Sequence, residues 1–200
     1  MSASKAVDSD LKVKVSRYMS YLLRHNPRGL RMNARGFVRL DDLLKKVRER
    51  YDVDEAFIRD TVYAGDKTRF QILDGKIGAL YGHTVDVEIH LPEDESVNVL
   101  YHGTTTESVA KILQKGLRSM KRKWVHLSTT KDTATEVGER RTPNPVILVI
   151  DAEKARRDGV RFYKATERVY LSKRIPPKYI KLHEMLPSVD SEDLSTRVSS

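Results

Sequence analysis

The sequence contains no cysteine and no long apolar run, and each absence excludes certain kinds of site or segment. A chain without thiols has no disulfides, no thiolate nucleophile and no cysteine-ligated zinc or iron–sulfur site, as expected for an intracellular, cytoplasmic protein. The longest uninterrupted apolar run, Val146–Ile150, is too short to cross a bilayer, and no N-terminal segment resembles a signal peptide. We therefore expect no membrane association.

Sequence signatures of several common enzyme classes are also missing. There is no GxGxxG or Walker A sequence for a nucleotide and no GxSxG for a serine nucleophile. The six histidines include no pair at HxxxH spacing, so we expect no metal site.

Positive charge is abundant and unevenly placed. The 200 residues carry 37 Lys and Arg against 28 Asp and Glu, a net charge of +9. Residues 1–40 contribute +7, residues 41–95 contribute −6 and residues 96–200 contribute +8. Two basic segments around an acidic middle predict a polyanionic partner that touches both ends of the chain, although a generally basic soluble protein would show the same totals.

The N-terminal part has the pattern of a winged helix. A polar segment, residues 1–10, is expected to be a flexible tail, and apolar residues from Val15 to Leu23 then recur at helical spacing until Pro27 ends a helix that begins at Leu11. Two further helices and a hairpin around Asp74-Gly75 complete the pattern, and we place this domain at residues 11–91.

From residue 97 onward, short apolar runs predict strands at 97–101, 124–128, 146–150, 160–163, 168–171 and 179–182. Helices are expected at 106–115 and 131–138, with a further helical turn at 151–157. Many strands and few helices predict an α+β fold with a mostly antiparallel sheet. We place this second domain at 96–187 and a flexible tail at 188–200.

The stretch Tyr101–Thr129 reads as strand, turn, helix, basic loop and strand. Thr104 and Glu107 are spaced as a capping box, and Gly116 stands where a glycine ends a helix. His102 and His126 mark strand ends beside the helix start, an arrangement that suits a phosphate-bearing ligand. A plain surface unit with incidental histidines is an equally good interpretation of this stretch.

The order of short motifs along the chain resembles that of the NAD-dependent RNA 2′-phosphotransferase family. The motifs are Leu23-Arg24-His25-Asn26-Pro27, Gly36-Phe37-Val38, Asp66-Lys67-Thr68-Arg69-Phe70, Gly82-His83-Thr84, Tyr101-His102-Gly103-Thr104, Gly116-Leu117, Arg122 with Val125-His126-Leu127-Ser128, and Gly138-Glu139-Arg140. Each motif is weak alone, but their order and spacing hold over nearly the whole chain.

The resemblance implies a fold and a reaction. The fold is an N-terminal winged-helix lobe and a C-terminal ADP-ribosyltransferase-like lobe. An internal RNA 2′-phosphate is transferred to NAD⁺ through an RNA-2′-phospho-ADP-ribose intermediate. The products are RNA with a free 2′-OH, nicotinamide and ADP-ribose 1″,2″-cyclic phosphate. The partner is 2′-phosphorylated RNA, NAD is a co-substrate, and the enzyme is expected to act as a monomer.

The resemblance also implies the roles of single residues. The catalytic quartet maps onto Arg24, His25, Arg69 and Arg140, with Arg141 as the alternative to Arg140. NAD contacts map onto His102, Gly103, Thr104, Gly116, Arg122, His126 and Ser128. Glu167 stays an outside candidate for a catalytic glutamate.

The sequence departs from the family pattern at three places. Gly78 and Tyr81 stand where the family has Arg and Gln, Trp124 stands for a His, and Glu167-Arg168 stands for Asn-Gly. Two other functions remain open: ADP-ribosylation of terminal phosphates of DNA or RNA, and nucleic-acid binding by a winged helix without catalysis.

Overall fold

The computed structural model describes residues 2–63, 68–88, 90–120 and 122–183. Asp66 and Lys67 of the third motif, and the predicted tail 188–200, lie outside the described residues. The described part has mixed helices and antiparallel sheets, so the predicted α+β class is confirmed. No helix within these ranges has the length and apolar character that crossing a membrane requires.

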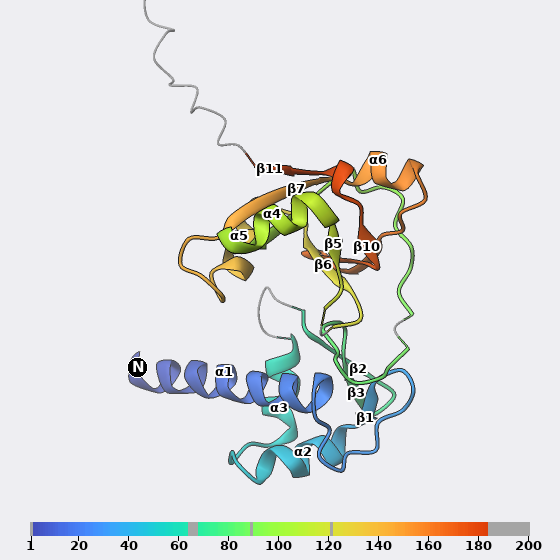
Figure 1. The fold of residues 1–200 in the computed structure, drawn as a ribbon. Coiled ribbons are helices and arrows are strands. Elements are labelled where there is room, and N and C mark those ends of the chain that lie inside the picture. Colours follow the sequence, from blue (N-terminus) through green and yellow to red (C-terminus); the bar gives the residue numbers. More distant parts are fainter. Residues whose placement is uncertain (1, 64–67, 89, 121, 184–200) are drawn as a thin grey trace, which may run out of the picture.

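The N-terminal half contains the helices α1 (Ser2–Arg24), α2 (Leu40–Arg48) and α3 (Glu55–Tyr63) and a three-stranded sheet. Its strands β1 (Phe37–Arg39), β2 (Phe70–Leu73) and β3 (Lys76–Ala79) run in the order β1-β3-β2. The three helices and the sheet pack together in this half (Figure 1). They enclose one hydrophobic core, in which Leu22, Leu43, Ile58 and Ile77 are fully buried.

Helix α1 begins earlier than the sequence predicts. It starts at Ser2 rather than Leu11, so residues 2–10 are not a separate tail. No glycine or proline occurs before Pro27 to interrupt the helix. Ion pairs between residues four apart, Lys12 with Asp8 at 3.2 Å and Lys14 with Asp10 at 2.6 Å, support the polar part.

The C-terminal half is built on a six-stranded sheet in the order β11-β7-β4-β6-β9-β8. Its strands are β4 (Val99–Thr104), β6 (Val125–Ser128), β7 (Val146–Asp151), β8 (Tyr163–Thr166), β9 (Val169–Ser172) and β11 (Ile180–Leu182). Leu100, Leu148, Ile150 and Phe162 are fully buried in a second core. Segment 80–98 links the two halves (Figure 1).

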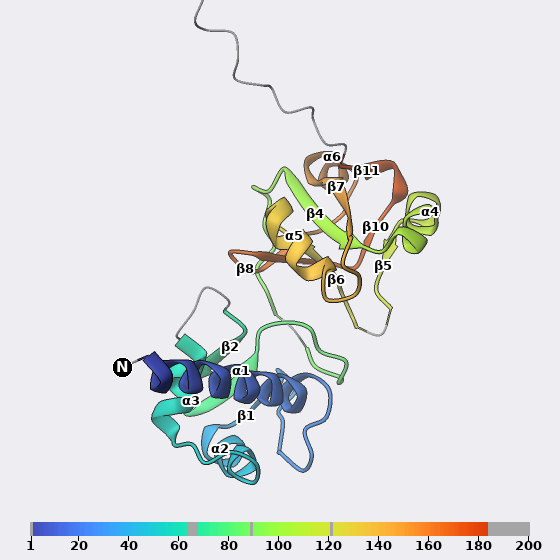
Figure 2. The ribbon, with the colours of Figure 1, turned by 90° about the vertical axis from the view of Figure 1, so that its left-hand side faces the viewer.

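Helices α4 (Thr106–Lys115), α5 (Lys131–Gly138) and α6 (Ala152–Arg157) accompany this sheet, and α5 packs on β4, β6 and β7 (Figure 2). The expected strand at 160–163 is wrong, because Phe162 is a core residue of a loop and β8 begins at Tyr163. Three short elements were not predicted from the sequence. They are the two-residue strands β5 (Leu117–Arg118) and β10 (Arg174–Ile175), which pair with each other, and the short helix η1 (Pro177–Tyr179).

The predicted capping box lies one residue off. Thr104 is the buried last residue of β4, and the N-cap of α4 is Thr105, whose hydroxyl lies 3.2 Å from that of Ser108. The prediction for Gly116 is confirmed, since it ends α4 with φ 77°, where glycine is favoured.

Candidate functional site

A cleft of about 940 Å³, part of it open to solvent, is lined by residues from both halves of the molecule. The N-terminal half contributes the end of α1, the approach to β2 and the loop after β3, through Arg24, Thr68, Arg69, Tyr81 and Gly82. The C-terminal half contributes β4, the approach to β6, β6 itself, α5 with the turn after it, and the β8–β9 turn. Residues far apart in the sequence thus face one shared cavity.

Arg24 is the most enclosed cation of the cleft. Its Nη2 donates a hydrogen bond to the carbonyl oxygen of Arg69 at 3.4 Å, and its guanidinium lies 5.0 Å from the ring centroid of Tyr81. Its Nε is buried without a partner among the described residues. Burial, followed by the charges of Arg122, Arg69 and Arg140, lowers the pKa of Arg24 to about 10. The side chain stays charged at neutral pH and keeps a donor free.

Three more arginines from distant parts of the chain line the same cleft. Arg69 is held by a hydrogen bond from its Nη1 to Ser16 Oγ at 3.2 Å. Arg140 is exposed in the turn after α5, and Arg122 is exposed in the approach to β6. Desolvation and the charges of Arg141 and Arg140 lower the pKa of Arg122. The cleft therefore concentrates positive charge, as a site for phosphate groups does.

Arg140 lines the cleft and Arg141 does not, although the two residues are adjacent and both are exposed. Arg141 nevertheless lies close enough for its charge to lower the pKa of His102 after the larger effect of burial. Of the two arginines, Arg140 is the better candidate for contact with a ligand.

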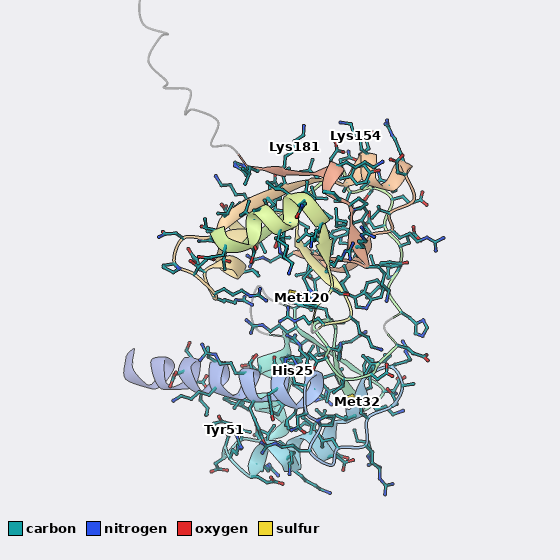
Figure 3. The ribbon with its side chains drawn as sticks, in the orientation of Figure 1. His25, Met32, Tyr51, Met120, Lys154 and Lys181 are labelled. Carbon is teal, nitrogen blue, oxygen red and sulfur yellow. The ribbon has the colours of Figure 1, made fainter. Side chains whose placement is uncertain are left out.

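His25 is not among the residues that line the cleft. It is exposed at the C-terminal end of α1, on the side of this half that faces the other half (Figure 3). Its Nδ1 lies 3.0 Å from Thr84 Oγ1. Burial of part of the ring and the charges of Arg122 and Arg24 lower its pKa, so the imidazole is neutral at pH 7. A neutral imidazole at the cleft edge is able to accept a proton.

His102 and His126 form one wall of the cleft. Nδ1 of His102 donates to the carbonyl oxygen of His126, and Nδ1 of His126 donates to that of Trp124, each at 3.0 Å. These bonds put the proton on Nδ1 and leave Nε2 as an acceptor. Nε2 of His126 is buried and has no partner among the described residues. Burial and the charge of Arg122 lower the pKa of His126 to about 3.

The other residues predicted to contact NAD divide into two groups. Gly103 and Ser128 line the cleft, but Thr104 and Gly116 do not. Gly116 packs against backbone instead, because a Cβ added there would lie 2.2 Å from the carbonyl oxygen of Ile175. The geometry gives Gly116 a role in packing α4 against β10.

Sequence reasoning missed several lining residues, of which Arg168 and Tyr81 are the most informative. Arg168 donates from Nε and Nη2 to Thr133 Oγ1 at 3.2 and 3.0 Å, and from Nη2 to Glu136 Oε1 at 3.0 Å. It thus joins the β8–β9 turn to α5 at the cleft. The only signal for both was that they departed from the family pattern. Glu167 also lines the cleft.

Comparison with known proteins identifies the class to which this two-halved fold and cationic cleft belong. Residues 10–174 match the model of the RNA 2′-phosphotransferase, Tpt1 / KptA family. A Thermococcus kodakarensis protein named "Probable RNA 2'-phosphotransferase" is 42% identical over 172 residues, covering 84% of this chain and 96% of that protein. Relatives of the same name from Pyrococcus furiosus and Rhizobium leguminosarum are 41% and 40% identical, covering 87% and 85% of this chain and 97% and 94% of theirs.

The chain belongs to the RNA 2′-phosphotransferase family. The resemblance stated from the motifs is thereby confirmed.

Proposed function

We propose that the protein removes an internal RNA 2′-phosphate by transferring it to NAD⁺. The observation that carries the proposal is the convergence of Arg24, Arg69, Arg122 and Arg140 on one cleft. Both substrates carry anionic phosphate groups: the RNA reacts through a phosphate dianion, and NAD⁺ carries a pyrophosphate beside the ribose that reacts. Arginine binds such groups through its planar fork and does not lose its charge at neutral pH.

The residues of the cleft fit NAD⁺ as the second substrate. NAD⁺ supplies an electrophilic ribose carbon with nicotinamide as its leaving group. The wall of His102, Gly103, His126 and Ser128 offers two unprotonated Nε2 acceptors beside strand backbone, which suits ribose hydroxyl groups. We assign the C-terminal half to NAD⁺ as an ADP-ribosyltransferase-like lobe, and the N-terminal half to RNA as a winged-helix lobe.

In the first step the RNA 2′-phosphate attacks that ribose carbon and nicotinamide leaves. The phosphate is already ionised at neutral pH, so this step needs positioning and charge stabilisation rather than a base. Arg24 and Arg69, linked by a hydrogen bond, hold the phosphate from the N-terminal side. Arg140 approaches from the C-terminal side.

In the second step the neighbouring ribose hydroxyl attacks phosphorus and the RNA 2′-oxygen leaves. The proton of that hydroxyl must reach the departing 2′-oxygen, and the arginines stabilise the extra charge on phosphorus. His25 is neutral at pH 7 and next to Arg24, and we assign to it the proton transfer or the orientation of the phosphate. Because Arg24, Arg69 and Arg140 all face one cleft, each serves both steps in this proposal.

The test is product identification. The protein is mixed with NAD⁺ and an oligonucleotide that carries one internal 2′-phosphate. Release of ADP-ribose 1″,2″-cyclic phosphate together with 2′-OH RNA supports the proposal. Absence of turnover across pH and salt would refute it. A stable ADP-ribosylated nucleic acid as the end product would indicate the terminal-phosphate reaction instead.

A further inference from the structure

The face of α1 that carries Arg24 continues along the helix beyond the cleft. An α-helix turns about 100° per residue, so Arg17, seven residues before Arg24, projects within about 20° of it. Val13 falls within about 20° on the other side, and Tyr21 within about 60°. Arg17, Val13 and Tyr21 are all exposed, the last two by 45% and 38%. These three residues, here called the α1 track, lead away from the cleft.

The charge of the α1 track suits a polyanion. Lys12 pairs with Asp8 and Asp60, and Lys14 pairs with Asp10, so these charges largely cancel. Arg17, in contrast, forms no ion pair or hydrogen bond within the described residues, and its guanidinium is available. An exposed arginine in line with the phosphate-holding Arg24 is where a strand extending from the cleft would present its next phosphates.

Tyr21 is an oriented aromatic surface between Arg17 and the end of the helix. Its hydroxyl accepts a hydrogen bond from Asn26 Nδ2 at 3.0 Å, and the guanidinium of Arg28 lies 5.4 Å from its ring centroid. Both contacts fix the ring before any ligand arrives. Exposed tyrosines next to arginines stack on unpaired bases without sequence preference.

We propose that the α1 track binds the single-stranded RNA that flanks the phosphorylated nucleotide, with Tyr21 stacking on a base and Arg17 neutralising a backbone phosphate. The inference rests on the proposed function, which places the 2′-phosphate at Arg24. Seven residues of helix span about 10 Å, or about three stacked bases at about 3.4 Å each. Arg17 therefore contacts RNA about three nucleotides from the reaction centre.

The experiment compares two substrates of different length. One is a dinucleotide with the internal 2′-phosphate, and the other is a ten-nucleotide single strand with the same group at its centre. For the long substrate, Arg17→Ala is expected to raise KM about tenfold at low salt, with kcat unchanged, and to reduce the salt slope of RNA binding by about one. Tyr21→Ala is expected to raise KM at least fivefold, while Tyr21→Phe keeps the wild-type value. The dinucleotide should be turned over equally by all variants.

The matched control for charge is Lys181→Ala, since Lys181 is exposed on β11 at the edge of the molecule opposite α1 (Figure 3). This variant removes the same unit of charge and should leave KM unchanged for both substrates. Equal effects on the two substrates, or none on the long one, would overturn the inference. Fluorescence anisotropy with the long RNA measures RNA affinity independently of turnover. If the wild-type protein bound RNA through Arg17 yet released no product, the proposed function would be refuted, and the inference that the α1 track binds RNA would be supported.

Discussion

Replacing Gly103 by alanine should destabilise the C-terminal half because the strand packs directly on a helix there. A Cβ at position 103 would lie 2.1 Å from the backbone oxygen of Ala134 and 3.2 Å from Cα of Gly138. Both belong to α5, so no flexible side chain can move aside. Relief requires α5 to shift by about 1 Å from β4, and such overpacking costs about 3 kcal/mol.

The single tryptophan provides the assay for Gly103→Ala. Trp124 lies in the C-terminal half, with its ring centroid 5.2 Å from that of Tyr163, so its fluorescence reports the unfolding of that half. With a urea m-value of about 2 kcal/mol/M, a loss of about 3 kcal/mol lowers the midpoint by about 1.5 M. Activity should fall with it, because Thr133, Glu136 and Val137 of α5 line the cleft.

The control is Gly159→Ala in the same half. Gly159 has φ 85° and no atom within 4 Å of an added Cβ, so its substitution measures backbone strain alone, about 1 kcal/mol. Gly103→Ala must cost clearly more than this. A Gly103→Ala variant at least as stable as Gly159→Ala would refute the close contact between β4 and α5.

Three further predictions concern charge. Arg69→Ala and Arg140→Ala should each abolish turnover or trap ADP-ribosylated RNA, and single-turnover analysis by gel would show it; wild-type turnover in both would contradict their assignment. Arg168→Ala removes a cation and three hydrogen bonds to α5 in the half assigned to NAD⁺, so KM for NAD⁺ should rise about tenfold in steady-state kinetics, with Arg168→Lys recovering part of the loss. Stability should fall in acid. The pKa is about 3 for buried His126 and about 4 for buried His83, whose two ring nitrogens lack partners among the described residues. Both values lie below the unfolded value of about 6.5, so the unfolded chain binds the proton first. Between pH 6.5 and pH 5, each histidine should lower the free energy of unfolding by about 2 kcal/mol. In His83→Gln, the urea midpoint should therefore change less with pH than in the wild-type protein.

The periodic elements could be predicted because one burial pattern determined each of them. Val15, Met19, Leu22 and Leu23 of α1 are fully buried, and their spacing alone indicated the helix. Where burial did not follow the period, prediction failed: Phe162 is buried in a loop, and β5 and β10 are too short to show any alternation.

The candidate site was predictable only through the motifs. Nothing in the spacing of Arg24 and Arg69, 45 residues apart, shows that one donates a hydrogen bond to the backbone of the other. Their meeting depends on how α1 packs against the start of β2. The contributions of Tyr81 and Arg168 could not be derived, because they arise from tertiary contacts that no local pattern encodes.

Because Arg24 is desolvated, only an arginine keeps its full positive charge at this position. Its surroundings lower the pKa to about 10, which still leaves the guanidinium fully charged in any cell. A lysine shifted by the same amount from its ordinary value would titrate at about pH 8 and lose part of its charge near neutrality. The cluster of like charges thus persists before any phosphate arrives, and it cannot be relieved by releasing a proton. Part of the affinity for an anion then comes from ending that mutual repulsion, so the empty cleft is already biased toward its ligand.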